Sequence, residues 1–277
     1  MVLGGGIALP LMTEFLSYPA GDVGGKQDCE LKAFKRLARR LKEAFSRQRI
    51  MVLLDGLYAN GPVITLCRKN GWQFMIVLKD GSLPSVWDEA NGLRPLEPKN
   101  RYEMTWEDRR QRYWWVNGIP YAYDNGPRRP ETLHVVVCEE TWEEVDRETC
   151  EIVTKRSRHA WISSEPLLAS NLHERCNLCG RHRWEIESSI LVEKCHGYQY
   201  EHCFAHDWKA TKGYHYLMRI GHFFNVLVQL SEKLAGMIRS MTVRGFISFI
   251  RETVVGPWLT PDRVTARLRG CLQLRLE

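Results

Sequence analysis

The sequence predicts an α/β protein in which a mixed sheet is flanked by helices, with a mainly β insertion and a helical C-terminus. Three observations predict this class. A helical pattern over residues 28–49 precedes an apolar run, Ile50–Leu54, which is typical of a buried strand. Between residues 87 and 158 the helical periodicity fades and strand-like runs replace it. Beyond residue 208, apolar side chains recur at helical spacing.

The first expected element is the helix over residues 28–49, which begins at Asp28 as a predicted N-cap. Its apolar stripe consists of Leu31, Phe34, Leu37, Leu41 and Phe45. Lysines and arginines, including Lys35 and Arg39, crowd the remaining surface. Such a basic face can contact a DNA backbone, and a solvated outer surface is the alternative.

The apolar run that follows ends in Asp55, directly before Gly56. An acid at the carboxyl end of a buried strand lies where sheets with helical crossovers bind ligands. A turn-forming aspartate before glycine is the alternative. A short helix near residues 61–70, a strand over 73–78 and a turn at 79–81 are expected next.

The middle of the chain is expected to form a β-rich insertion, residues 87–158, within a core made of residues 1–86 and 159–240. Its predicted strands include residues 113–116, 133–138 and 150–154. Trp114 and Trp115 offer stacking surfaces, and Arg128 and Arg129 offer phosphate contacts. Packing of a small sheet is the simpler explanation of the two tryptophans.

After the insertion, the expected elements are a returning strand at residues 159–164, a helix over 168–192 and a long helix over 208–238. The apolar face of the long helix is predicted to cover the sheet, through Leu217, Ile220, Phe223, Phe224, Leu227 and Leu230. Two further helical patterns, interrupted by Gly256–Pro257, form a C-terminal tail over residues 241–277.

Composition indicates a globular protein of 277 residues in a reducing cytoplasm. Hydrophobic residues are 44% of the chain, which argues against gross disorder. The net charge of +6 is compatible with a polyanionic partner. The nine cysteines are too dispersed for a small disulfide scaffold, and no signal peptide is recognisable. Polar residues interrupt the apolar stretch 217–230, so we expect no membrane span there.

A second motif lies far downstream, where Arg183, Glu187 and Lys194 are spaced four and seven residues apart. In a continuous α-helix these offsets return to one face. A carboxylate flanked by two cations suits a metal-bound phosphodiester, and a salt-bridged helix face is the alternative.

The segments 26–36, 54–58, 70–79, 180–187 and 197–202, in that order, resemble the bacterial insertion-sequence transposases of the DDE superfamily. The resemblance covers about residues 1 to 230. It implies a ribonuclease-H-like core, in which Asp55 is the second catalytic acid and Glu187 the third. Arg183 and Lys194 would be the basic members of the family's Tyr–Arg–Glu–Lys signature.

The implied activity is phosphodiester cleavage and strand transfer on transposon-end DNA, by two copies in a synaptic complex. Asp55 and Glu187 would bind Mg²⁺, a hard ion that prefers oxygen ligands, and Mn²⁺ would substitute. Arg183, Lys194, Lys35 and Arg39 would contact phosphates.

The chain departs from the family pattern in two places. The signature tyrosine is Gly180 here. At the front, residues 1–6 look like the family's second strand and Ile7–Phe15 like its third, while Asp22 and Asp28 do not follow a strand. We therefore expect that the first catalytic aspartate is absent and that the chain is an N-terminally truncated transposase with impaired cleavage.

The rival interpretation is a non-enzymatic DNA-binding module stabilised by zinc. Its ligands would come from Cys176, Cys179, Cys195, His196, His202, Cys203 and His206. Buried thiols and hydrogen-bonded histidines are the simpler explanation of the same residues.

Overall fold

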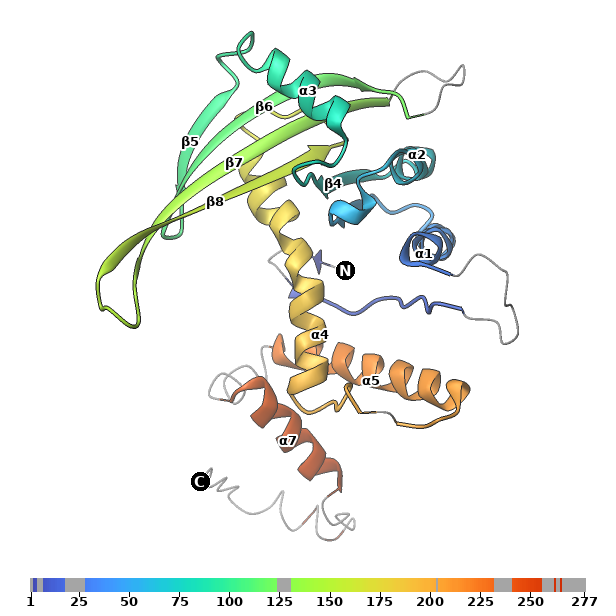
Figure 1. Ribbon diagram of the computed structural model, residues 1–277. Helices are drawn as coiled ribbons and strands as arrows, with labels where there is room; N and C mark the ends of the chain where they lie inside the picture. The colour runs from blue at the N-terminus through green and yellow to red at the C-terminus, as the bar shows by residue number, and fades with distance from the viewer. Residues whose placement is uncertain are drawn as a thin grey trace. The chain divides into compact units, whose positions relative to one another are not determined.

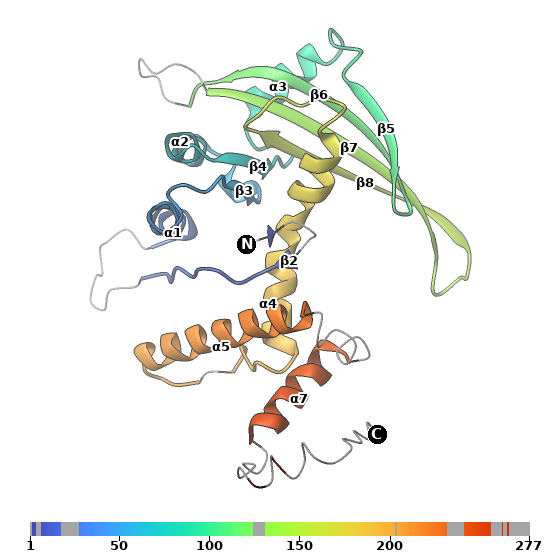
Figure 2. The ribbon, with the colours of Figure 1, turned by 180° about the vertical axis from the view of Figure 1, so that it is seen from behind.

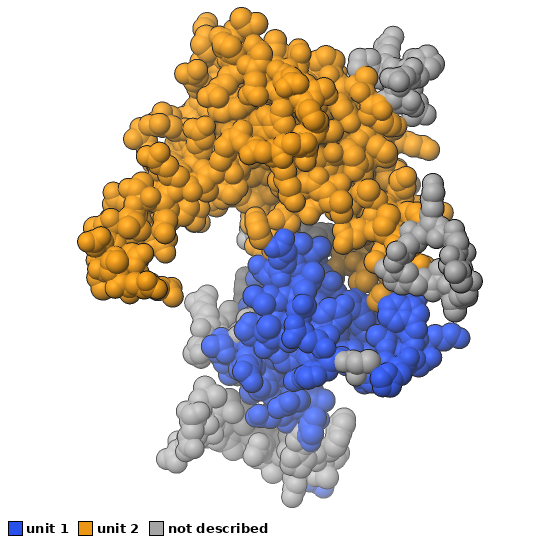
Figure 3. Space-filling model, in the orientation of Figure 1, with its two compact units in different colours: residues 1, 8–10, 186–277 blue, residues 2–7, 11–185 orange. Residues whose placement is uncertain are grey.

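The computed structural model describes residues 2–3, 7–17, 28–123, 131–202, 204–231, 241–255, 262 and 265. The chain divides into two compact units, which are coloured separately in Figure 3. Unit 1 comprises residues 1, 8–10 and 186–277, and unit 2 comprises residues 2–7 and 11–185. The long strands therefore all belong to unit 2, and the helices after residue 186 belong to unit 1.

Unit 2 is built on a six-stranded mixed sheet flanked by helices, which confirms the predicted α/β class (Figure 1). The strands are β3 (Met51–Leu54), β4 (Gln73–Val77), β5 (Arg101–Trp106), β6 (Arg109–Tyr121), β7 (Glu131–Val145) and β8 (Ile152–Ser163). Their order is β3-β4-β8-β7-β6-β5. β3 and β4 run parallel, and every other neighbouring pair is antiparallel.

The β-rich middle of the chain is continuous with this sheet, because the end of β8 pairs with β4, Met75 lying opposite Ser163. Figures 1 and 2 show β5 to β8 as one long, curved surface. The predicted strands at residues 113–116 and 133–138 lie within β6 and β7. Those predicted at 150–154 and 159–164 are parts of one strand, β8, which begins at Ile152 and ends at Ser163. Whether residues 87–158 behave as a separate domain stays a prediction.

The helices of unit 2 begin with α1 (Glu30–Ala44), η1 (Gly56–Tyr58), α2 (Gly61–Asn70) and α3 (Pro84–Leu93). α2 has the predicted bounds because both of its ends are specified. Asn60 Oδ1 accepts a hydrogen bond from the Val63 amide at its start, and Gly71, with φ of +69°, ends it. α3, which starts with a proline in its first turn, was not predicted from the sequence.

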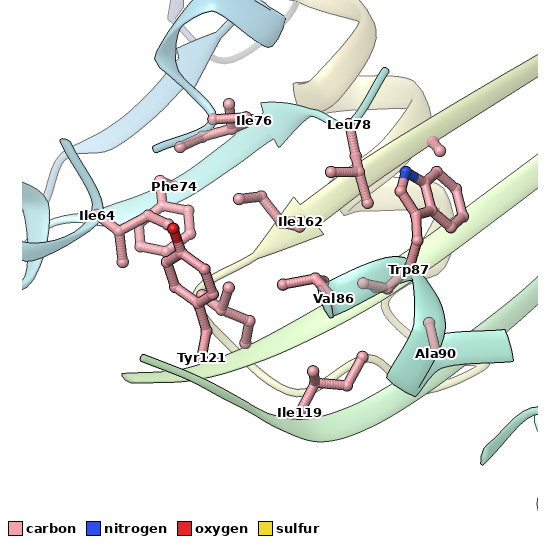
Figure 4. Close-up of a cluster of buried hydrophobic side chains, with 14 of the residues drawn as sticks. Ile64, Phe74, Ile76, Leu78, Val86, Trp87, Ala90, Ile119, Tyr121 and Ile162 are labelled. Atoms are coloured by element: carbon pink, nitrogen blue, oxygen red, sulfur yellow. The ribbon is translucent and has the colours of Figure 1, made fainter. Parts of the chain in front are cut away.

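One hydrophobic core lies between α2, α3 and the sheet. Ile64 of α2 and Ala90 of α3 are fully buried there, with Phe74 and Ile76 of β4 and Ile162 of β8. Figure 4 shows these side chains pointing toward one another. The buried tryptophans of β6 are divided between the two faces, because Trp114 belongs to this core and Trp115 to the core on the opposite face. Packing therefore accounts for both, as the simpler interpretation predicted.

Two expectations about the N-terminal region were wrong. The predicted strand Ile7–Phe15 is limited to β2 (Ile7–Ala8), which pairs with β1 (Val2–Leu3) in a separate two-stranded sheet. Pro10 follows, without a backbone N–H for a sheet. Arg40 Nη1 donates to the carbonyl oxygen of Thr13, and Arg36 Nη2 donates to that of Phe15. These carbonyl oxygens therefore accept from side chains of α1 instead of from a neighbouring strand.

Asp28 is not the N-cap of α1, a position that Cys29 takes without a side-chain hydrogen bond. The Asp28 carboxylate accepts two hydrogen bonds from the Arg36 guanidinium, at 3.1 and 2.7 Å, and one from the Ser17 amide. A charged, bidentate partner outcompetes the local cap. Asp22 lies outside the described residues.

The predicted helix over residues 168–192 is three consecutive elements instead of one. They are the π-helix η2 (His173–Cys179), the 3₁₀-helix η3 (Gly180–Trp184) and α4 (Glu185–Cys195). The argument that Arg183, Glu187 and Lys194 share a helical face fails, because Arg183 precedes the α-helix and the residues per turn change at that boundary.

Unit 1 contains most of α4, together with α5 (Trp208–Gln229) and α7 (Val243–Val255). Asp207 caps α5 by accepting from the Ala210 amide at 2.7 Å. The fully buried Glu193 of α4 accepts from Arg219 and pairs with His222 of α5, at 3.0 and 2.7 Å, which ties the two helices together. The part of the long helix predicted beyond residue 231 and the second tail helix fall largely outside the described residues.

The apolar face predicted for α5 is largely exposed, and whether it covers the sheet stays a prediction, because the sheet is in unit 2 and α5 in unit 1. Leu217, Ile220 and Phe224 are 71%, 52% and 58% exposed. The side chains that α5 buries are His215, Met218 and His222. The reason is that the buried Glu193 carboxylate recruits polar partners, so the inward side of α5 is defined by charge pairing as well as by apolar spacing. None of the described helices is long and apolar enough to cross a membrane.

Candidate functional site

Asp55 lies where the sequence predicted, directly after β3 and at the carboxyl end of the parallel pair β3 and β4. Its Oδ1 accepts a hydrogen bond from the Leu57 amide at 3.0 Å, so Asp55 is the N-cap of η1. The side chain is half-buried. The turn-forming role and the strand-end position are therefore both real, and the cap fixes the direction of the carboxylate.

Lys79 packs over Gly56, the residue after Asp55, and was predicted from the sequence only as part of a turn. Its aliphatic stem crosses Gly56, where an added Cβ would come within 2.8 Å of Lys79 Cγ and Cδ. The Trp87 indole donates to the Lys79 carbonyl at 3.1 Å and fixes the backbone there. The residue is exposed, so its ammonium group is available at the same edge of the sheet as Asp55. Lys79 could have been chosen from the sequence, because it is the first charged residue after the second parallel strand, at the end of the sheet where ligands bind.

Arg183 reaches the same pair of strands from a different part of unit 2. It lies in η3, which packs against both β3 and β4. Its guanidinium carbon is 4.5 Å from the centre of the Trp184 ring. The cation–π contact limits where the guanidinium can point. Unit 2 thus brings Asp55, Lys79 and the segment carrying Arg183 to one pair of parallel strands.

Glu187 and Lys194 belong to unit 1, on α4. Glu187 is exposed, and Lys194 Nζ is 3.5 Å from Glu201 Oε1. Because Asp55 is in unit 2, the meeting of Asp55 and Glu187 around a metal ion stays a prediction.

The basic surface of α1 is only partly available. Glu14 and Asp28 pair with Arg36 and Arg40, which neutralises those two cations. The hydrogen bonds from Arg36 and Arg40 lower the pKa of Glu14, against the opposing effect of burial. Lys35 and Arg39 are exposed, with no ion pair to any described residue. Because Glu14 and Asp28 occupy Arg36 and Arg40, Lys35 and Arg39 are the better candidates for phosphate contacts on α1.

Gly180 is buried against an aromatic ring. An added Cβ would be 3.1 Å from Trp161 Nε1 and 3.3 Å from the Arg175 carbonyl oxygen. The tyrosine that the family signature has at this position would meet the same two groups. A side chain larger than glycine at this position therefore requires Trp161 or the η2 backbone to shift.

We predict that Gly180→Ala destabilises unit 2 by about 1–3 kcal/mol, the usual effect of overpacking a dense core. Urea denaturation monitored by tryptophan fluorescence measures it. Gly92→Ala is the matched control, since an added Cβ there meets nothing within 4 Å. Equal stability of the Gly180→Ala variant and the control would contradict the tight contact with Trp161.

The possible zinc ligands do not gather among the described residues, where no group of three His, Cys, Asp or Glu side chains could hold a metal ion. Cys176 is fully buried in η2, and burial raises the pKa of its thiol. Burial also raises the pKa of Cys179. Burial therefore favours the protonated form of both thiols in the metal-free protein. Cys203 lies outside the described residues.

The sequence was compared with known proteins: no protein-family model matches it, and no curated protein is significantly similar to it.

Proposed function

We propose that this chain binds DNA as a DDE-type insertion-sequence transposase, with the phosphate backbone contacted at the carboxyl ends of β3 and β4. The observation that carries the proposal is the packing of Lys79 across Gly56, directly beside Asp55. It places the stem of a cation over the residue that follows a carboxylate, at the edge of a parallel pair, where ligand sites form.

In this proposal the basic residues contact phosphates and the acidic residues bind metal ions. Lys79 and Arg183 neutralise phosphates in unit 2, and Lys194 does so from unit 1. Lys35 and Arg39 on α1 extend the contact along the backbone. None of these contacts reads base sequence, so they supply affinity and position for transposon-end DNA, with two copies in the synaptic complex.

Asp55 supplies one hard oxygen ligand for Mg²⁺ in unit 2, and Glu187 supplies another in unit 1. Bound Mg²⁺ or Mn²⁺ would activate the attacking water or 3′-hydroxyl and stabilise the leaving oxygen. No third ligand joins Asp55 among the described residues. The residues present hold such ions weakly, and we expect cleavage by this chain to be weak, while DNA binding persists.

The first test is the salt dependence of DNA binding, measured by fluorescence anisotropy with a labelled duplex. We expect Lys79→Gln and Arg183→Gln each to weaken binding several-fold and to reduce the slope of log K against log salt by about one. Arg112→Gln is the matched control, because Arg112 is exposed and already pairs with Glu103 at 3.3 Å.

Unchanged slopes in both Lys79→Gln and Arg183→Gln would overturn the proposed interface. Cleavage is measured in parallel with Mn²⁺ on transposon-end DNA. Efficient cleavage that is lost in both Asp55→Asn and Glu187→Gln would show that a third acid completes the site, which contradicts the expected impairment.

A further inference from the structure

A second polar cluster lies on the face of the sheet opposite α3, and the proposed function does not use it. Its centre is Glu140 of β7, which is 1% exposed. One carboxylate oxygen, Oε2, accepts from Arg109 Nη1 at 3.2 Å and from Ser157 Oγ at 3.1 Å. The other, Oε1, accepts from Gln111 Nε2 at 2.5 Å and from Arg181 Nη2.

The helical side of this cluster is a stripe of three residues spaced four apart, His173, Asn177 and Arg181. Asn177 is buried in the π-helix η2, where its Nδ2 donates to Gln111 Oε1 at 2.9 Å. Its Oδ1 accepts from Tyr113 Oη at 3.1 Å and from Arg181 Nε at 3.1 Å. The sheet and the helical segment are therefore joined through hydrogen bonds that use almost every polar atom present.

The geometry excludes a hydrolytic relay in this cluster. Ser157 Oγ and Glu140 Oε2 lie 3.1 and 3.5 Å from the same ring nitrogen, Nε2, of His159. A nucleophile–histidine–acid relay needs the acid on the other ring nitrogen. The chemistry of the cluster is thus structural pairing, with the acid as the shared acceptor.

Charge and stacking make the cluster rigid. Burial opposes ionisation of Glu140, but hydrogen bonds from His159, Gln111 and Arg181 outweigh it and hold the pKa of Glu140 well below its usual range. Arg181 lies over the Trp106 ring, 5.1 Å from its centre, and Arg109 lies over Trp142 at 4.2 Å. Each guanidinium is therefore fixed both by the carboxylate and by an aromatic face.

The cluster also coincides with an irregularity of the chain. η2 is a π-helix of seven residues, and it changes into the 3₁₀-helix η3 at Gly180, between Asn177 and Arg181. A π-helix is rare, so contacts outside the helix must favour it over an ordinary α-helix here. Asn177 and Arg181 are the side chains that hold the two ends of the transition to the sheet.

We propose that this Glu140 cluster positions Arg183, by fixing how η2 and η3 are wound. Arg183 follows Arg181 by two residues in the same five-residue 3₁₀-helix, which packs against β3 and β4. Arg181 acts as the tether and Glu140 as its anchor on the sheet. The role of Arg183 toward DNA rests on the proposed function, whereas the tether itself does not.

The tether is tested by hydrogen exchange of the full chain, comparing Arg181→Gln with the exposed control Arg112→Gln. We expect amides of residues 173–184 to exchange about tenfold faster in Arg181→Gln, since a charged hydrogen bond that stabilises the segment is lost. Amides of β6 to β8 should exchange at the rate of the control. Tyr113→Phe keeps the ring and removes the hydroxyl that lies within hydrogen-bond distance of Gln111 Oε1 and Asn177 Oδ1, so it gives a smaller change in the same segment if Arg181→Gln folds poorly.

Exchange that rises uniformly over unit 2, or not at all in residues 173–184, would overturn the proposal. DNA affinity then separates the two claims. Arg181→Gln should weaken binding several-fold in the parent chain and have no further effect when Arg183→Gln is present, because residues that act through one another are not additive. Additive losses would show that Arg181 does not act through Arg183. If the parent chain does not bind DNA, the proposed function is refuted. Hydrogen exchange would still test whether Arg181 holds residues 173–184 to the sheet.

Discussion

Glu140→Gln is expected to destabilise unit 2 by about 3–5 kcal/mol, the usual cost of removing one partner of a buried ion pair. Glutamine keeps the shape of the side chain but not the charge that holds Arg181 and Arg109. Arg181 suffers most, because its side chain is 17% exposed and cannot turn fully to water. Its guanidinium would stay near the sheet without an anion.

Urea denaturation of the parent chain and the variant at neutral pH measures this loss. Glu139→Gln is the matched control, since Glu139 is the adjacent residue of β7 and is exposed. A change within about 0.5 kcal/mol is expected for such a surface substitution. Similar stability of the two variants would show that the Glu140 charge does not hold the sheet and the helical segment together.

The second large effect is a loss of stability below neutral pH that is caused by His134. This histidine lies in β7 and is 6% exposed. Burial, together with the nearby cations Arg68 and Arg175, lowers its pKa to about 4 from an ordinary value of 6.5. Protonation of His134 is therefore less favourable in the folded state than in the unfolded chain.

Stability from this group is therefore fully present above pH 6.5, the unfolded pKa, and is lost as the pH falls toward about 4. The loss amounts to about 3 kcal/mol over that interval. His134→Gln removes the titration, so its stability should change less than that of the parent chain over the same pH range. His206→Gln, which alters an exposed histidine, should behave like the parent chain.

Stability is measured by urea denaturation at a series of pH values from 7 down to about 4, the pKa of His134 in the folded state. Acids such as Glu140, whose pKa is lowered in the folded state, titrate there below this pH range. A His134 pKa near 6.5, measured directly by NMR, would contradict the effect of burial.

Individual helices and strands could be predicted because the residues that specify them lie within or next to each element. Asn60 and Gly71 specify both ends of α2, and the apolar run before Asp55 specifies β3. Parts of β6, β7 and β8 were predicted from their composition, whereas β5 was not. By contrast, the helix over residues 168–192 was predicted as continuous, because no pattern along the chain shows that Asn177 and Arg181 bond to β6 and β7.

The candidate site divides in the same way. Asp55, Glu187, Arg183, Lys194, Lys35 and Arg39 were chosen from motifs and a family resemblance. Lys79 was missed, because its place beside Asp55 arises from the parallel pairing of β3 and β4 and from the room that Gly56 leaves. Glu140 gave no signal at all, since a buried acid reads as one more polar residue of a strand.

The sequence by itself determined the α/β class, the strand that ends at Asp55 and most of the helices, because spacing and capping act within a few residues. Only the tertiary structure decided which charges are available. It paired Arg36 and Arg40 with Glu14 and Asp28, and it buried Glu140 with Arg181. It also broke one predicted helix into π, 3₁₀ and α segments. The paired residues lie between 8 and 41 positions apart along the chain, so no pattern within one helix or strand shows them.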